Sequence, residues 1–250
     1  MKEIGYGDTS LQMNSAFYSG SIKDLVEQTS EAILGHLAKS NPFALDAAQR
    51  NAWLSQIDVT RTQCGQLDGW IAFEFAIPRM GKRADVVLVT AGIVFVIEFK
   101  IGSYKFDAAA VDQVVDYSPD LKNFHAGSHD RRIVPIVVAT LADNTAANLT
   151  WGSDGVASPI ASNGSNLGEI IEHVITQTPK QAALDGSQWS RTGYKPTPTI
   201  IEAARALYKG HRVEEITRSD AGAKNLSETA ACLAEIIEDA KANRKRRFAL

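Results

Sequence analysis

The sequence predicts an α/β fold in which helices flank a mixed central sheet. Three short apolar runs, at residues 69–77, 83–88 and 93–100, have the length and the Val, Ile and Phe content of β-strands. A segment with apolar residues at helical spacing follows at 108–124, and another apolar run follows at 133–140. The order strand, strand, strand, helix, strand is typical of a mixed α/β sheet.

Helices are also expected before and after these strands. Residues 21–37 carry apolar side chains at helical spacing, residues 43–57 have an alanine-rich helical pattern, and residues 167–175 predict a short helix. Residues 1–20 are polar and contain Gly and Ser, so we expect them to be poorly ordered or to cap the fold. Residues 141–164 are rich in Asn, Ser, Gly and Thr and predict no defined element.

The C-terminal part of the chain predicts a helical extension. An irregular connector with two prolines spans residues 189–198, and helical patterns follow at 199–208 and 226–242. We therefore expect a first domain at residues 1–178 and a helical extension at residues 179–250.

Composition places the chain among ordinary globular proteins. It has 250 residues, of which 44% are hydrophobic and 22% charged, and its formal net charge is -3. This charge does not itself indicate a nucleic-acid-binding protein, so any basic surface has to be local. Cys64 and Cys232 lie far apart and have no metal-ligand spacing, which favours reduced thiols. With no long apolar stretch, we expect a cytoplasmic protein without a membrane segment.

Charged residues stand inside two of the predicted strands. Asp85 interrupts one apolar run, and Glu98 and Lys100 interrupt the next. Side chains alternate along a strand, so Glu98 and Lys100 share a face, and a hairpin turn at residues 91–92 could bring Asp85 near them. Buried unpaired charge is costly, and a divalent cation between the carboxylates would offset that cost. An ion pair at the edge of the sheet is the simpler alternative.

The charged set fits the requirements of phosphodiester hydrolysis. Mg²⁺, or Mn²⁺ in its place, would be held by Asp85, Glu98 and the backbone carbonyl of Phe99 while leaving positions for water and phosphate. Lys100 could orient or deprotonate the attacking water and neutralise phosphate charge.

The set resembles the PD-(D/E)XK nuclease superfamily. Asp85 and the segment Glu98-Phe99-Lys100 match its motif, and Gln113 and Tyr117 match the Gln-x-x-x-Tyr variant of RecB-type members. The resemblance implies a restriction-endonuclease-like fold and places Gln113 and Tyr117, which share one helix face, beside the substrate phosphate. Ala84 stands where the superfamily name implies proline. A further acidic ligand is expected in some members, and the candidates are Glu74, Glu31 and Glu27.

The similarity extends to a particular group of proteins. Residues 74–85, 116–125 and 194–204 resemble the N-terminal region of bacterial nuclease–helicase fusion proteins, in which a Schlafen-related helicase module follows. The chain has no Walker A loop, so we expect no ATP site in it. A helicase partner would act in cis from a missing module, or in trans.

The leading expectation is a Mg²⁺-dependent nuclease that acts on DNA, in defence against foreign DNA such as phage or in repair. A homodimer would suit the cutting of both strands. The alternative is a catalytically silent nucleic-acid-binding module that regulates a helicase system, and a third reading is a structural domain. His125 and His129 could contact phosphate, but we expect them to be solvent-exposed at a helix end. Trp189 could stack on bases, but we expect it to lie in a core or at a domain boundary.

Overall fold

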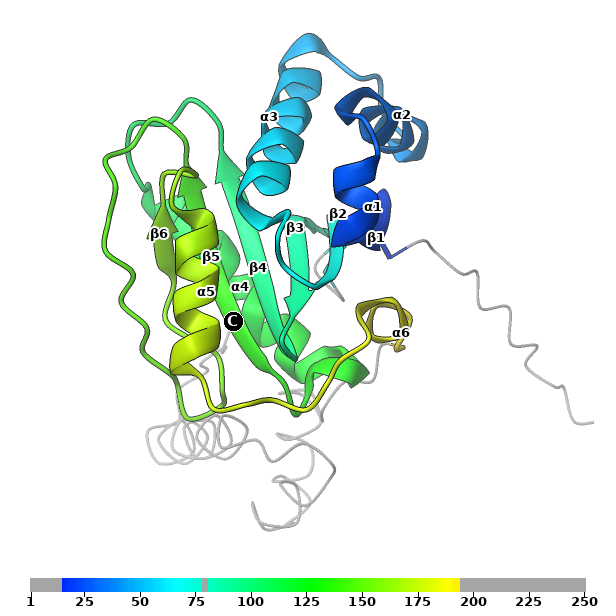
Figure 1. The fold of residues 1–250 in the computed structure, drawn as a ribbon. Helices are drawn as coiled ribbons and strands as arrows, with labels where there is room; N and C mark the ends of the chain where they lie inside the picture. The colour runs from blue at the N-terminus through cyan, green and yellow to red at the C-terminus, as the bar shows by residue number, and fades with distance from the viewer. Residues whose placement is uncertain (1–14, 78–80, 194–250) are drawn as a thin grey trace, which may run out of the picture.

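The computed structural model of the chain describes residues 15–77 and 81–193. A six-stranded mixed sheet forms the centre, with α4 behind it and α3 and α5 in front of it in Figure 1. The predicted α/β class is confirmed, and the arrangement is consistent with a restriction-endonuclease-like fold. The predicted helices at 199–208 and 226–242 lie outside the described residues.

The elements follow one another along the chain in an order that begins with an edge strand and three helices. They are β1 (Tyr18–Ser21), α1 (Ile22–Glu27), α2 (Ser30–Ser40), α3 (Ala47–Cys64), β2 (Gly69–Ala76), β3 (Arg83–Thr90), β4 (Ile93–Lys100), α4 (Ala108–Phe124), the 3-10 helix η1 (Ala126–Ser128), β5 (Arg132–Ala139), β6 (Ile160–Ser162), α5 (Leu167–Gln177) and α6 (Gly186–Ser190).

The strands are arranged in chain order from β1 to β6. Strands β1 to β4 pair in antiparallel fashion, whereas β5 runs parallel to β4 and β6 runs parallel to β5. The helix α4 is the crossover between the parallel strands β4 and β5. Both central strands, β3 and β4, are covered on both faces, which explains their nearly continuous apolar sequences.

Two apolar layers cover the sheet. One layer comes from α1, α2, α3 and α5, and its buried side chains include Leu37, Trp53 and Ile171. The other comes mainly from α4 and α6, with Tyr117 and Trp189 against the sheet. Burial of these large side chains supplies the main stabilisation of the fold.

The turn between β3 and β4 is a tight hairpin, as predicted. Ala91 and Gly92 have φ values of 50° and 76°, and positive φ at both central residues is typical of a type I′ turn. A Cβ atom at Gly92 would lie 2.4 Å from the carbonyl oxygen of Ala182, so this turn also depends on the absence of a side chain there.

The N-terminal region differs from the sequence prediction. The single helix predicted at 21–37 is two helices, because Thr29 accepts a hydrogen bond from the backbone N–H of Ala32 and starts α2 anew. Residues that were expected to be poorly ordered include the edge strand β1, in which Tyr18 pairs with Phe73. The helix predicted at 43–57 begins at Ala47 and continues to Cys64.

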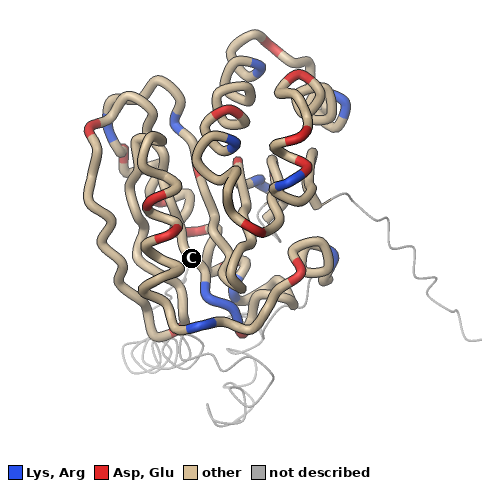
Figure 2. The backbone as a smooth tube through the Cα atoms, in the orientation of Figure 1, with Lys and Arg blue, Asp and Glu red and all other residues tan. Residues whose placement is uncertain are grey.

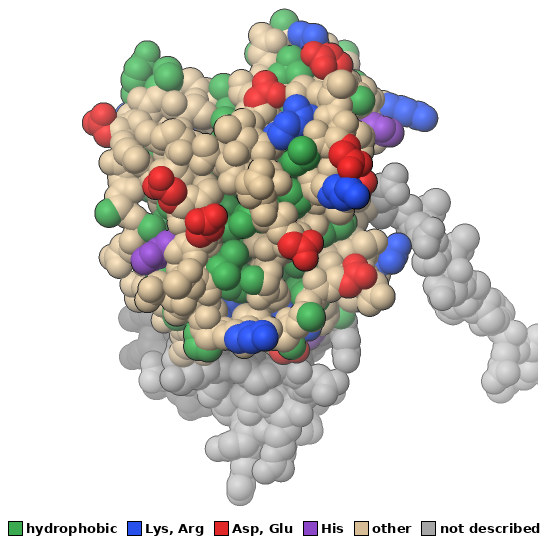
Figure 3. Space-filling view, viewed as in Figure 1, with side chains coloured by type: hydrophobic (Ala, Val, Ile, Leu, Met, Phe, Trp, Pro, Cys, Tyr) green, Lys and Arg blue, Asp and Glu red, His purple; other side chains and the backbone are tan. Residues whose placement is uncertain are grey.

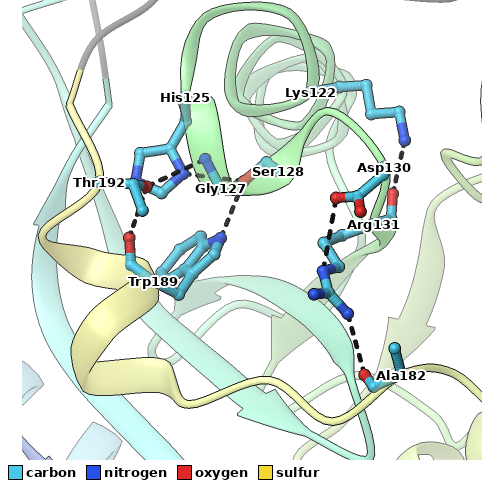
Figure 4. A network of polar contacts seen from close by, with 9 residues as sticks. All are labelled: Lys122, His125, Gly127, Ser128, Asp130, Arg131, Ala182, Trp189 and Thr192. Carbon is cyan, nitrogen blue, oxygen red and sulfur yellow. Dashed lines mark hydrogen bonds and ion pairs between the residues drawn. The ribbon is translucent and has the colours of Figure 1, made fainter.

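A buried polar network holds α6 against the end of α4 (Figure 4). Trp189 stacks on Phe75, with ring centroids 5.2 Å apart, and its Nε1 donates to Ser128 Oγ over 2.9 Å. His125 contacts Ser128 through Nδ1 (2.9 Å) and Thr192 through Nε2 (3.1 Å). The expectation that His125 is solvent-exposed is wrong, since it is 3% exposed. The prediction of Trp189 as a core residue is confirmed.

The network fixes the state of the imidazole. Thr192 Oγ1 donates its single hydrogen to the carbonyl of Trp189 over 2.7 Å and so can only accept from His125, which makes Nε2 the protonated nitrogen of a neutral ring and leaves Nδ1 to accept from the Ser128 hydroxyl. Burial, with a smaller contribution from His129, lowers the pKa of His125 from 6.5 to about 4. His125 and Ser128 are both too deeply buried to act on a substrate, so they are structural residues.

Stability is therefore expected to depend on pH through His125. The unfolded chain takes up the proton near pH 6.5 and the folded chain only near pH 4, so the contribution of His125 to the free energy of unfolding should fall by about 3 kcal/mol as pH drops through that window. Denaturant unfolding at pH 7.5 and pH 4 measures this change in the free energy of unfolding. His125→Gln should remove most of this pH dependence and His36→Gln, at an exposed position, should retain it. Equal pH dependence in His125→Gln and wild type would contradict the assignment.

Candidate active site

The pairing of β3 with β4 brings the two predicted carboxylates to the same place. The last paired residues are Val86 and Ile97, and the same register continued by one residue puts Asp85 opposite Glu98. Directly opposed residues of an antiparallel pair point to the same face. Lys100 follows on that face at the carboxyl end of β4, beside the beginning of α4.

Hydrogen bonds link four of the five predicted catalytic side chains in a row. Lys100 Nζ lies 3.1 Å from Glu98 Oε1 and donates to Gln113 Oε1 over 3.2 Å. Gln113 Nε2 then donates to the hydroxyl oxygen of Tyr117 over 2.7 Å. Gln113 and Tyr117 are neighbours on one face of α4, as predicted from their spacing. The row therefore joins the sheet to the crossover helix.

Asp85 joins the set through the backbone of β4. Its Oδ2 accepts a hydrogen bond from the backbone N–H of Phe99 over 2.7 Å, which fixes the carboxylate next to the segment of Glu98 and Lys100. This bond engages one carboxylate oxygen. Phe99 also lines the groove described below, and the role of its carbonyl as a ligand stays a prediction.

Both carboxyls are held in surroundings that disfavour their charged forms. Burial, followed by the charge of Glu98, raises the pKa of Asp85 well above its usual value. Burial also raises the pKa of Glu98, although the ammonium of Lys100 opposes that effect. The Oε2 atom of Glu98 is buried and has no hydrogen-bond partner. A divalent cation would satisfy that oxygen and offset the repulsion between the two carboxylates.

These residues form the floor of a groove of about 740 Å³. One wall is Asp46 with the N-terminal half of α3 as far as Gln56, and the other is formed by Ile101, Gly102, Ser103 and Asp107 of the loop that follows β4. In Figure 1, α3 and this loop rise on either side of the carboxyl end of β4. The floor is therefore accessible from solvent, and the Lys100 side chain is 30% exposed.

The groove includes one residue that sequence reasoning missed. Gln56 on α3 is 4% exposed, lines the groove, and has a buried Oε1 without a hydrogen-bond partner. An unsatisfied buried amide oxygen needs an explanation, and a cation or an ordered water would provide one. The available signal was a polar side chain on the buried stripe of α3, between Trp53 and Thr60.

The structure separates the three candidates for a further acidic ligand. Glu74 lies beside the site: its charge raises the pKa values of Asp85 and Glu98, and its Oε1 accepts from Trp53 Nε1 over 2.8 Å. Its φ of 54° is unusual for a residue other than glycine, and strain of this kind is often found at functional sites. Glu31 and Glu27 are exposed on α2 and α1 and are not among the residues that line the groove.

Two further observations describe the chemistry that is present. Within residues 15–77 and 81–193, no group of three or more His, Cys, Asp and Glu side chains is placed to hold a metal ion, so a cation here would be held by Asp85 and Glu98 together with water, amide or backbone oxygens. Figure 2 shows Lys and Arg spread over several elements, so basic charge is not concentrated on any one of them.

No helix among the described residues is both long and apolar enough to cross a membrane.

Comparison with known proteins identifies no relative of this chain. No protein-family model, no curated protein and no solved structure matches it.

The raised pKa of Asp85 predicts that its ionisation destabilises the metal-free fold. The folded carboxyl retains its proton to higher pH than the unfolded one, so stability falls as pH rises from about 4 through the folded pKa. In EDTA at pH 8, Asp85→Asn should unfold with a larger free energy than wild type, by about 1.4 kcal/mol for each pH unit between the two pKa values. Denaturant unfolding measures the difference.

The gain should be largely lost at pH 4, where the folded carboxyl is protonated and the unfolded one is about half protonated. Asp112→Asn, at an exposed position of α4, is the matched control and should leave stability unchanged at both pH values. An Asp85→Asn variant that is less stable than wild type at pH 8 would show that the carboxylate is satisfied without a cation.

Proposed function

We propose that this chain is a divalent-cation-dependent nuclease that hydrolyses phosphodiester bonds of DNA. The observation that carries the proposal is the convergence of Asp85, Glu98 and Lys100 on the floor of one open groove, where Glu98 Oε2 is buried without a partner. An ion pair at the sheet edge accounts for Glu98 Oε1, which lies 3.1 Å from Lys100, but leaves the other oxygen unexplained.

Asp85, Glu98 and the carbonyl of Phe99 would hold Mg²⁺, with Mn²⁺ as a substitute, and the Gln56 amide oxygen is a further candidate ligand. When bound, the ion would supply charge neutralisation for the phosphate and a lowered pKa for water. The protein contributes fixed oxygens: Asp85 is held by the Phe99 N–H, and Glu98 is fixed on the central strand β4.

Lys100 is the residue best placed to contact a phosphate. Its ammonium has two acceptors, Glu98 Oε1 and Gln113 Oε1, so one N–H remains to donate toward the groove. Gln113 is in turn held by Tyr117, whose pKa is raised by burial and which therefore keeps its hydrogen. The two α4 residues thus position the ammonium, and the ammonium stabilises negative charge that develops on the scissile phosphate.

Removal of either charged group should abolish cleavage. Asp85→Ala and Lys100→Ala are each expected to reduce the rate of DNA hydrolysis in Mg²⁺ or Mn²⁺ by about 100-fold or more, since each removes a group that acts on the reacting phosphate. Cleavage of plasmid and of a fluorogenic oligonucleotide measures the rate.

The matched controls are Asp112→Ala on the solvent side of α4 and Lys23→Ala on α1, which should both cleave like wild type. Equal rates in wild type, Asp85→Ala and Lys100→Ala would exclude this groove as the source of cleavage. DNA binding without cleavage by the wild type would instead support the silent regulatory module.

The contribution of Gln56 can be measured without an activity assay. Mg²⁺ or Mn²⁺ should raise the melting temperature of wild type, because binding to the folded state alone stabilises it. Gln56→Met should reduce that increase, whereas Gln49→Met, the same change at an exposed position of the same groove wall, should not. If Gln56→Met showed the full increase, its amide would not be a ligand.

A further inference from the structure

Two aromatic side chains are unusually exposed. Phe43 is 78% exposed and Tyr104 is 76% exposed, the highest values among the large hydrophobic side chains of the described residues. Figure 3 shows hydrophobic side chains at both upper projections of the molecule in that view. Single exposed apolar residues need no explanation, but two rings on loops that lead to lining residues of the candidate groove do.

The two rings occupy equivalent positions on the two walls of the groove. Phe43 stands three residues before Asp46, and Tyr104 stands three residues before Asp107. Asp46 caps α3 by accepting from the Gln49 N–H over 2.7 Å, and Asp107 caps α4 by accepting from the Ala110 N–H over 2.8 Å. Both capping residues line the groove. Neither ring is itself a lining residue, but each lies on a loop within three residues of a lining residue, and the two loops lead to opposite walls; these two loops are called the rims.

The loop geometry holds each ring outward. The Asn41 side chain accepts from the backbone N–H of Phe43 over 3.1 Å, which defines the turn that leads into α3. On the other rim, Ser103 Oγ donates to the carbonyl of Lys105 over 2.8 Å, which closes a turn around Tyr104. Both aromatic faces are thus presented to solvent by short, hydrogen-bonded loops.

We infer that these rims bind the unstacked bases of a single-stranded nucleic acid whose backbone lies in the groove. The inference rests on the proposed function for the assignment of the groove floor to the phosphate. Exposed Phe and Tyr rings stack on any base, because every base has a π-face. The bases of a duplex are stacked on one another and are not accessible in this way. DNA and RNA single strands share this chemistry.

Charge in the groove favours stacking over simple electrostatic attraction. Asp85 and Glu98 on the floor and Asp46 and Asp107 on the walls outnumber Lys100. A phosphate backbone is therefore repelled until a cation neutralises the floor. Binding to single strands should require a divalent cation, and the rings should supply much of the remaining affinity.

The test measures binding of short labelled single strands, DNA and RNA, and of a matched DNA duplex to the full chain by fluorescence anisotropy. Ca²⁺ or EDTA is present. In Ca²⁺, Phe43→Ala and Tyr104→Ala should each weaken single-strand binding about fivefold or more, and duplex binding should not change. EDTA should abolish binding of the wild type to single strands.

Three further variants separate stacking from other causes. The double variant Phe43→Leu, Tyr104→Leu keeps apolar area without a π-face and should bind weakly, whereas Phe43→Tyr, Tyr104→Phe should bind like wild type. Val26→Ala, an exposed apolar position on α1, should have no effect. Unchanged melting temperatures are expected throughout, because these side chains are exposed.

The inference is overturned if Phe43→Ala and Tyr104→Ala both bind single strands as tightly as wild type, or if duplex and single-strand affinities fall equally. Its failure is distinct from failure of the nuclease proposal. Wild-type cleavage that depends on Asp85, with no effect of the ring variants on binding, would support the nuclease proposal and reject single-strand binding by the rims. Ring-dependent binding of single strands without cleavage would support binding by the rims and reject the nuclease proposal.

Discussion

The register between β3 and β4 is the constraint on which the site depends. Asp85 and Glu98 face one another only because Val86 pairs with Ile97, and a slip by one residue would turn one carboxylate to the opposite face. The tight turn at Ala91 and Gly92 sets that register, because both residues have positive φ and a two-residue turn of this kind allows only one pairing of the flanking strands. The cost of two buried acids is thus imposed by the same pairing that stabilises the centre of the sheet.

Features that depend on neighbouring residues were predictable from the sequence. The strands β2 to β5 are strongly apolar, and the alternation of side chains placed Glu98 and Lys100 on one face. The spacing of Gln113 and Tyr117 likewise predicted a shared face of α4, which their 2.7 Å hydrogen bond confirms. In each case the relevant geometry is set within a few residues.

Features that depend on distant packing were not predictable. Gln56 reaches the groove only because of the way α3 docks on the sheet, and its sequence context resembles that of any core helix. His125 is buried by Trp189 and Thr192, which come more than sixty residues later and are invisible to local patterns. The strand β1 is too short and polar to be recognised without its partner β2, whose pairing covers it.

The electrostatic balance of the site argues against a purely structural ion pair. Lys100 and Arg83, which lies beside Glu74, carry two positive charges, whereas Asp85, Glu98 and Glu74 supply three groups that can be negative. Burial raises the pKa of all three acids, although the Phe99 N–H at Asp85, Lys100 at Glu98 and Trp53 at Glu74 act in the opposite direction. A structural pair would gain from replacement of one acid by an apolar residue. A positive ligand that enters from the groove would offset the remaining negative charge, and the proposed cation site rests on this balance.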